Sequence, residues 1–296
     1  MIKRTLFLGK PLRLSTRHRQ LVLRDETKET SQPIEDIGWV VIEHPQISIT
    51  MPTMQALLAH NVSVIFCDEK VMPAGMLLPF EGHYSQSARY QAQIAAGKST
   101  KKKLWQQTIR AKLNNQAGLL KKLGMIETPL LRYARQVLSG DSSNQEGLGA
   151  KYYWSQLFQE SNIDWKRARY GEAPNQLLNY GYAILRSCAA RAIVGVGLLP
   201  ALGIHHHNKY NAFPLADDLM EPYRPFVDML VYEWVMEHGL DESLSTPAKA
   251  HLLRLAQLDT KWDDGTRPLM NSLRKTASQL AQCFLGERRS VRYPKL

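Results

Sequence analysis

The amino-acid sequence predicts an α+β protein in which a small, β-rich, sandwich-like N-terminal domain precedes a larger all-α-helical domain. Short apolar runs of strand length occupy residues 1–83, whereas segments with helical patterning and proline starts occupy residues 84–296. Between them, Pro79–His83 fits neither pattern and marks the domain boundary. A chain of 296 residues is long enough for two domains of these sizes.

The N-terminal domain is expected to consist of short strands joined by tight turns. Runs that are apolar throughout predict strands buried on both faces, and the polar turn at Arg17–His18 predicts a hairpin. One helix, Thr53–His60, follows Pro52, a residue that suits a first helical turn. The expected strands are Thr5–Leu8, Leu12–Leu14, Leu21–Arg24, Gly38–Glu43, Ile47–Thr50, Val62–Cys67 and Met76–Leu78.

In the second domain, Pro174, Pro214, Pro247 and Pro268 mark helix starts, because proline is tolerated in the first turn and not in the interior. The basic segment Arg288–Arg292 is expected to be frayed, as chain ends often are. The expected helices are Tyr84–Ala96, Leu104–Leu123, Pro129–Leu138, Gln145–Phe158, Pro174–Val196, Pro214–His238, Pro247–Leu258 and Pro268–Leu285.

Composition excludes several classes of protein. The sequence contains no run of 18 apolar residues, so neither a membrane-spanning helix nor a membrane partner is expected. The first apolar run ends at Lys10, which is too short for the core of a signal peptide. Cys67, Cys188 and Cys283 are far apart and match no zinc spacing. So sparse a set of thiols suits the reducing cytoplasm.

The net charge of +11 is concentrated in one stretch. Residues 84–140 contain eleven Lys and Arg but a single acid, Glu127, whereas the rest of the chain is nearly balanced. A charge run is usually a solvated face, yet the lack of balancing acids favours contacts with the phosphates of duplex DNA. The candidate DNA-binding residues are Lys98, Lys101, Lys102, Lys103, Arg110, Lys121 and Lys122.

The segment Gly203–Pro225 carries the strongest candidate site. His205–His207 lies about a dozen residues before Asp218 and Glu221, whose i, i+3 spacing places both acids on one helix face. One imidazole with carboxylates suits Mg²⁺ or Mn²⁺ better than zinc. The alternatives are that the acids complement a helix N-terminus and that the histidines form a polar surface loop. Pro222 disfavours the α conformation at Glu221 and predicts a kink there.

Two further segments carry candidate residues. Glu146 begins a helix whose next residues include Gly147 and Gly149, so Glu146 is either catalytic or a complement to the helix N-terminus while the glycines let two helices cross. Asn175 and Asn179 share a helix face at i, i+4 spacing. Their amides are expected to orient the metal-binding carboxylates without binding the metal themselves. Helix capping and core packing are the alternative for this pair.

These blocks together resemble the CRISPR-associated Cas1 integrases, which insert new spacers into CRISPR arrays, and the His-His-Asn-Lys-Tyr-Asn-Ala-Phe stretch is most similar to the type II branch. The resemblance implies catalytic metal ligands at Glu146, His206 and Glu221, with Asp218 nearby as a ligand or a partner of one. His206 is preferred to His205 because, in the family pattern, two residues separate a glycine from the histidine. At the position of the last acid, other branches of the family have Asp, whereas this chain has Glu221.

The resemblance also implies partners and a reaction. The N-terminal domain is expected to mediate homodimer and partner contacts, and the dimers to join a small ferredoxin-like adaptation protein in a heterohexamer on duplex DNA, together with other type II CRISPR proteins in a prokaryotic cytoplasm. The expected reaction is attack of a DNA 3′-hydroxyl on a phosphodiester, with Mg²⁺ or Mn²⁺ as cofactor. The alternatives are a hydrolytic metal-dependent nuclease or phosphodiesterase and a non-enzymatic DNA-binding scaffold.

Overall fold

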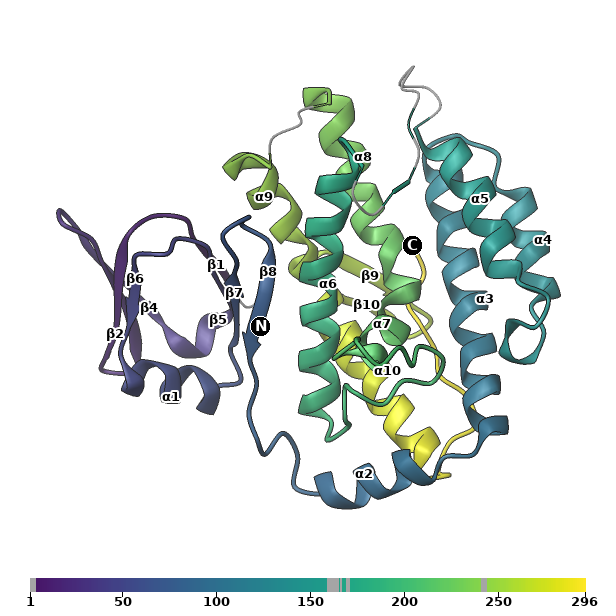
Figure 1. Ribbon diagram of the computed structural model, residues 1–296, viewed down its shortest axis with the longest axis horizontal. Coiled ribbons are helices and arrows are strands. Elements are labelled where there is room, and N and C mark those ends of the chain that lie inside the picture. The colour runs from purple at the N-terminus through teal and green to yellow at the C-terminus, as the bar shows by residue number, and fades with distance from the viewer. Residues whose placement is uncertain (1–3, 159–164, 166, 169–170, 241–243) are drawn as a thin grey trace. The chain divides into compact units, whose positions relative to one another are not determined.

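The computed structural model describes residues 4–158, 165, 167–168, 171–240 and 244–296 (Figure 1). The chain divides into two compact units, Met1–Phe80 and Glu81–Leu296, so the division falls three residues before the predicted boundary at residue 83. The first unit is built on β-sheets and the second is mainly helical, which confirms the predicted α+β class. No helix of the described residues is long and apolar enough to cross a membrane.

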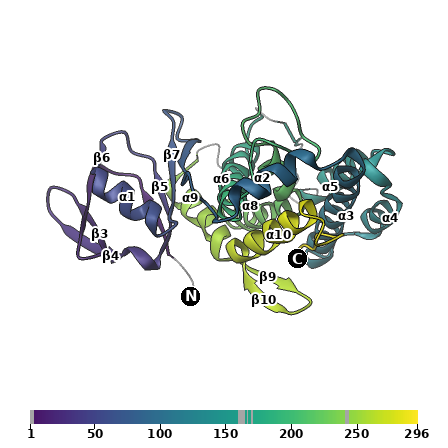
Figure 2. The same cartoon turned by 90° about the horizontal axis from the view of Figure 1, so that it is seen from below.

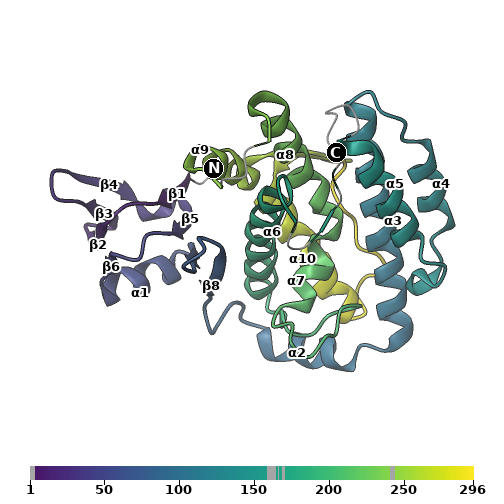
Figure 3. The same cartoon turned by 45° about the horizontal axis from the view of Figure 1, so that its top comes forward.

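The N-terminal unit contains two four-stranded sheets and one helix, α1 (Met51–Ala59), which Figure 3 shows beside β6. One sheet has the order β1-β5-β7-β8, with β1, β5 and β7 parallel and β8 antiparallel. The other has the order β4-β3-β2-β6, in which only β2 and β6 run parallel. The bounds are β1 Arg4–Leu8, β2 Leu12–Arg17, β3 Gln20–Arg24, β4 Glu29–Pro33, β5 Ile37–Ile42, β6 Ile47–Ile49, β7 Ser63–Cys67 and β8 Pro73–Leu77.

Both sheets and α1 share one hydrophobic core. Leu14 and Leu21 come from one sheet, Val40 and Val64 from the other, and Leu57 from α1, and all five are fully buried. Each such side chain stabilises the unit by about 1.5–3 kcal/mol through the apolar surface removed from water. The sandwich-like arrangement therefore rests on alternate residues that point inward from both sheets.

The helical unit is organised around α6 (Asn175–Gly195), which packs against α7, α8, α9 and α10. A second group consists of α3 with α4 and α5, at the right of Figure 1. Figure 2 shows the β9–β10 hairpin projecting beside α10. The remaining bounds are α2 Gln86–Ala95, α3 Lys98–Lys122, α4 Thr128–Gln136, α5 Gln145–Leu157, α7 Pro214–Met220, α8 Arg224–His238, α9 Thr246–Leu253, β9 Asp259–Trp262, β10 Gly265–Pro268 and α10 Leu269–Phe284.

The helix predicted at Pro214–His238 is broken after Met220. A single 3₁₀ turn, Glu221–Tyr223, separates α7 from α8. Pro222 and Pro225 lack backbone N–H groups, so the helical ladder cannot run through both positions. The predicted interruption is present as this turn, but Glu221 itself keeps α-helical dihedrals, with φ −50° and ψ −47°, so the expected loss of the α conformation at Glu221 is wrong.

The C-terminal segment is packed, so the predicted fraying of Arg288–Arg292 is wrong. Val291 is only 6% exposed, and its backbone N–H donates to the Gln107 side chain of α3 at 2.8 Å. The Tyr293 hydroxyl lies 2.7 Å from Thr108 Oγ1, also on α3. Position at the chain end predicted fraying, but the contacts of Val291 and Tyr293 fasten this segment to α3.

The crossing of α3 and α5 depends on Gly149. A Cβ at this position would lie 2.2 Å from Leu113 Cδ2, and Leu113 is fully buried, so it has little room to yield. The close approach matters for the site because it brings Glu146, at the start of α5, next to α3. The small residues predicted to let two helices cross thus perform this role at Gly149.

Gly149→Ala is expected to lower the free energy of unfolding by about 1–3 kcal/mol, because the added methyl overpacks the α3–α5 contact. Urea unfolding followed by circular dichroism measures the change. Leu113→Ala in the same chain should offset part of the loss by removing the opposing methyl groups. Gly195→Ala is the matched control, since nothing lies within 4 Å of its added Cβ. A Gly149→Ala variant as stable as that control would contradict the packing argument.

Candidate functional site

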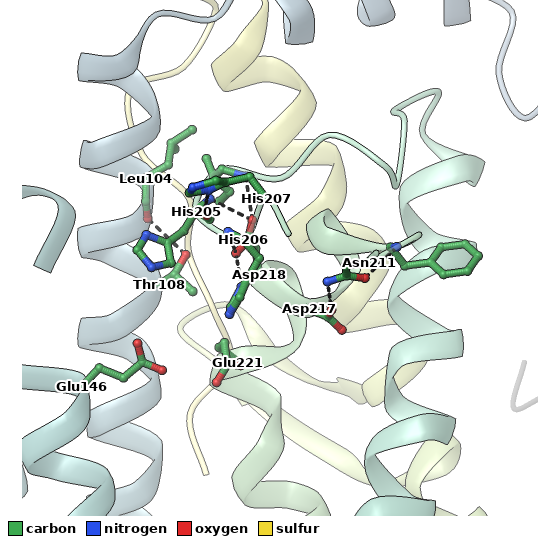
Figure 4. Close-up of polar contacts among 12 residues, drawn as sticks. Leu104, Thr108, Glu146, His205, His206, His207, Asn211, Asp217, Asp218 and Glu221 are labelled. Carbon is green, nitrogen blue, oxygen red and sulfur yellow. Dashed lines mark hydrogen bonds and ion pairs between the residues drawn. The ribbon is translucent and has the colours of Figure 1, made fainter. Parts of the chain in front are cut away.

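Two acids from different segments meet on one lysine. Lys112 Nζ, from the middle of α3, lies 2.6 Å from Glu146 Oε1 and 2.6 Å from Glu221 Oε2. Glu146 comes from the first turn of α5 and Glu221 from the turn after α7. Figure 4 shows both glutamates beside the same stretch of α3. The structure thus brings together two of the three predicted metal ligands, which are 75 residues apart in sequence.

Glu221 is ionised despite its burial. Its side chain is 4% exposed, which opposes ionisation, but Arg224 and Lys112 outweigh that effect and lower the pKa of Glu221 to about 2. Arg224 Nε donates to Glu221 Oε1 at 2.9 Å, so each carboxylate oxygen faces a cation. Burial likewise opposes the charge on Lys112, but Glu221 and Glu146 raise the pKa of Lys112, which stays protonated. The site therefore consists of fixed charges of both signs.

Asp218 holds the histidine loop. Its fully buried carboxylate accepts the backbone N–H groups of Ile204, His205 and His206 at 2.6–3.1 Å. Its Oδ1 also lies 2.7 Å from His206 Nδ1. Because a carboxylate only accepts, Nδ1 carries the proton in this contact, and Nε2 of a neutral His206 keeps its lone pair. Asp218 is thus fully engaged in orienting the loop and the imidazole.

The two candidate histidines have different environments. The His205 ring stacks flat on Trp105 of α3, with centroids 4.1 Å apart and planes 3° from parallel. Burial lowers the pKa of His205, which favours the neutral form of this ring. His206 meets the same indole edge-on at 5.6 Å. Trp105 therefore supports both rings, but only His206 is held by an acid in the manner of a metal ligand.

The close folding of this loop requires Gly203. A Cβ on Gly203 would lie 2.2 Å from the backbone oxygen of His206 and 2.8 Å from Asp218 Oδ2. Beyond the histidines, Asn211 Nδ2 donates to Asp217 Oδ2 at 2.6 Å. Asp217 also pairs with Arg186 Nε of α6 at 2.7 Å. The loop is thus fastened to α7 at both of its ends.

Asn175 and Asn179 lie beside an arginine. Their Oδ1 atoms accept from Arg167 Nη1 and Nη2 respectively, each at 2.8 Å. Arg167 lies over the Tyr182 ring at 5.5 Å, and Arg224 lies over the same ring at 4.6 Å. The expected role of the two asparagines in supporting the site stays a prediction, and the described contacts connect them to Glu221 through Arg167, Tyr182 and Arg224.

A buried acid that the sequence analysis did not select lies next to this network. Asp228 Oδ2 accepts from the Tyr153 hydroxyl at 2.8 Å, and Oδ1 accepts from the Tyr182 hydroxyl. Burial raises the pKa of Asp228 to about 6, against the lowering effect of the two tyrosines. Asp228 therefore joins α8 to α5 and α6 and fixes the ring on which Arg224 rests.

The predicted DNA-binding residues are distributed along α3. Lys98, Lys102 and Lys103 are exposed in its first turns and Lys101 is half-buried. Lys121 and Lys122 are exposed at its end. Arg110 is exposed as well, but its Nη2 donates to Val137 O at 2.9 Å. The outer face of α3 is thus basic along most of its length, while the inner face carries Lys112 to the acids.

Sequence reasoning counted Lys112 among the basic residues of α3 and missed its place in the site. The helical spacing of the apolar and polar residues around Lys112 indicated that it lies on the inward face of α3. Trp105, Ile109 and Gln116 precede or follow Lys112 at intervals of three, four or seven residues and are all buried on one side of α3. A lysine on the inward face of a helix requires buried acids as partners.

The predicted ligands have the chemistry to hold a divalent cation, although the structure does not place all three of them together. No three His, Cys, Asp or Glu side chains of the described residues lie close enough together to hold a metal ion. Two carboxylates nevertheless converge on one cation, the Lys112 ammonium, and Asp218 orients His206. Oxygen donors with one imidazole match the preference of Mg²⁺ or Mn²⁺. The groups that would hold the ion are Glu146, Glu221 and His206.

The chain thus combines a β-rich unit with a helical unit that carries paired acids, an oriented histidine and a basic helix. The family model for CRISPR associated protein Cas1 matches residues 6–255. The chain belongs to the Cas1 family.

Relatives and solved structures agree with this assignment. A CRISPR-associated endonuclease Cas1 of Neisseria meningitidis is 35% identical over 256 residues, which is 86% of this chain and 83% of the relative. The fold is that of a Thermotoga maritima Cas1 protein, with a TM-score of 0.78, 17% identity, and 98% and 99% of the two chains covered. It is also that of a casposase bound to integration product, with a TM-score of 0.81, 20% identity, and 97% and 92% covered.

Asp218→Asn is expected to release the histidine loop and to reduce a pH-dependent part of the stability. The hydrogen bond to Asp218 raises the pKa of His206 above its ordinary 6.5, against the effect of burial. A raised histidine pKa adds stability that is complete below the unfolded pKa and is lost as pH rises through the folded pKa. The variant should lose at least about 1–3 kcal/mol by leaving buried N–H groups unpaired.

Urea unfolding in EDTA at about pH 5.5 and about pH 8.5 measures both effects on either side of the histidine titration. Glu237→Gln is the control, because that carboxylate is 72% exposed. The difference in unfolding free energy between the two pH values should shrink in the Asp218 variant alone. If the Asp218 variant keeps the wild-type difference in unfolding free energy between the two pH values, the role given to Asp218 is wrong.

Proposed function

We propose that this chain is a divalent-metal-dependent DNA endonuclease and integrase of a type II CRISPR system, which joins spacer DNA to an array by transesterification. The observation that carries the proposal is the convergence of Glu146 and Glu221 on one buried cation, beside a histidine that Asp218 orients. Glu146, Glu221 and His206 would hold Mg²⁺ or Mn²⁺, which would supply a Lewis acid for a phosphodiester and for the charge that develops on it. Membership of the Cas1 family supports the nuclease and integrase class.

Each residue of the site has a defined task in this proposal. Glu146 and Glu221 would hold the ion through carboxylate oxygens, and His206 would hold it through Nε2. Asp218 holds the protonated Nδ1 of His206 and so presents Nε2 to the ion. Arg224 fixes the Glu221 carboxylate. The nucleophile is the 3′-hydroxyl of the incoming DNA, and one phosphodiester bond breaks as another forms, so the chain needs no nucleophile of its own.

The partners proposed for this chain follow from its charge and its relatives. The lysines of α3 bind backbone phosphates of duplex DNA without reading the base sequence. One solved structure with this fold is a casposase bound to integration product, and another is a Cas6-RT-Cas1–Cas2 complex. We propose that two copies of this chain dimerise through their N-terminal units and join a small ferredoxin-like partner, as a heterohexamer with which other type II CRISPR proteins associate.

Glu146→Gln and Glu221→Gln are each expected to lower strand transfer by about 100-fold or more, because each removes a charged ligand of the ion. The assay joins a labelled duplex fragment to a supercoiled plasmid that contains the repeat, with Mg²⁺ or Mn²⁺ and purified partner protein. Circular dichroism confirms that the variants fold. Glu237→Gln, which removes an exposed acid, should keep the wild-type rate.

The products of the same assay separate the alternatives. Joined DNA that forms with the wild-type protein but with neither glutamine variant supports the integrase. Nicked or cut plasmid without joining identifies a hydrolytic nuclease that uses the same site. Full strand transfer in either glutamine variant overturns the proposed site, and DNA binding without any metal-dependent reaction identifies a scaffold.

Reversing Lys102 and Lys103 to Glu is expected to weaken duplex DNA binding and to flatten its dependence on salt. Removing one lysine–phosphate interaction reduces the slope of log K against log salt by about one. Fluorescence anisotropy with a random-sequence duplex at several salt concentrations measures both quantities. Lys28 and Lys70, exposed residues of the N-terminal unit, give a control pair with the same change in charge. If both pairs of substitutions weaken DNA binding equally, α3 is not part of the DNA-binding surface.

A further inference from the structure

We propose that Lys112 is a built-in counter-ion of the two site carboxylates, which it holds in place until a divalent cation displaces it. The inference rests on the proposed function, because it assigns Glu146 and Glu221 as ligands of that cation. It adds a residue that competes with the metal and shapes the site. Lys112 is accordingly a positioning residue in the metal-free protein.

The geometry leaves the ammonium and an ion no room to share the same oxygens. Lys112 Nζ lies 2.6 Å from an oxygen of each glutamate, which is full ion-pair contact on both sides. A divalent cation bound to the same two oxygens would occupy the same space. Lys112 therefore has to swing away on its flexible stem when an ion enters.

The charges give the same result. Without metal, Lys112 and Arg224 balance Glu146 and Glu221, so this group of four side chains is neutral. A divalent cation that entered beside both basic side chains would create a doubly positive group in a region where Glu221 is only 4% exposed. The ammonium is the member that can leave, because its only described polar contacts are the two carboxylates, whereas Arg224 also lies over the Tyr182 ring.

Burial explains why the position is occupied by lysine. Glu146 and Glu221 come from different segments, and their oxygens would repel each other if nothing lay between them. The Lys112 side chain is 10% exposed, so its charge requires these partners as much as they require it. The ammonium thus keeps the ligands assembled in the absence of metal.

The test compares Mn²⁺ binding by Lys112→Gln and wild-type protein, both full-length and stripped with EDTA. Isothermal titration with MnCl₂ alone measures affinity, and thermal melts with and without MnCl₂ measure stability. The variant should bind Mn²⁺ about tenfold or more tightly, since the competitor is gone. It should also melt at a lower temperature in EDTA and gain more from Mn²⁺ than wild type. Equal or weaker binding by the variant overturns the proposal.

Two further variants keep the test decisive. Lys151→Gln removes an exposed lysine from α5 and should leave Mn²⁺ affinity unchanged. Lys112→Arg keeps the charge between the acids, so it should bind Mn²⁺ no more tightly than wild type. This variant decides the question if Lys112→Gln does not fold, because tighter binding by Lys112→Arg overturns the competition.

The glutamate variants separate this inference from the proposed function. Glu146→Gln and Glu221→Gln should each lose most of the Mn²⁺ affinity of wild type. If they do and Lys112→Gln shows no gain, the metal site stands and the counter-ion role fails. If both glutamate variants bind Mn²⁺ as wild type does, the metal site itself is wrong and the inference falls with it.

Discussion

The site of the helical unit depends on one buried ion-pair group, Lys112 between Glu146 and Glu221. These three side chains come from α3, α5 and the turn after α7, so their attraction joins the two helical groups of this unit. A buried pair adds little net stability over an apolar contact, but the loss of one partner costs about 3–5 kcal/mol, because a charge is left without compensation. The arrangement is therefore better suited to fixing a geometry than to adding stability.

Helix α3 organises its surroundings through a row of polar residues on its inner face. Thr108, Lys112 and Asn115 follow one another at intervals of four and three residues and so lie on one side of the helix. Thr108 meets the hydroxyl of Tyr293, and Asn115 Nδ2 donates to the backbone oxygens of Pro222 and Pro294. The C-terminal segment, the turn that carries Glu221 and the start of α5 are thus all fixed to the helix whose outer face is basic.

Sequence patterns predicted most of the elements because prolines and apolar runs are local signals. Strand β4 was not predicted, because Glu29–Pro33 contains no aliphatic or aromatic residue and pairs only as the outer strand of its sheet. The packing of the C-terminal segment was predicted wrongly, because its partners Thr108 and Gln107 lie about 180 residues earlier. Local spacing already placed Lys112 on the buried side of α3, but it could not identify the partners of Lys112, since Glu146 and Glu221 are distant in sequence. Long-range partners are the information that local patterns lack.

The sequence left two interpretations of Asp218, as part of a metal site and as a structural acid that binds backbone N–H groups. These two interpretations overlap in the structure. Asp218 does bind backbone N–H groups, as a structural acid would, but they belong to the loop of His205 and His206 rather than to its own helix. The same carboxylate binds His206 Nδ1 and so sets the orientation of the ring. Satisfying the backbone of a buried loop and aiming an imidazole are here one interaction. A carboxylate at this position is therefore required by the fold and by the proposed chemistry for the same physical reason, which is that only an acceptor with several lone pairs can meet all four donors.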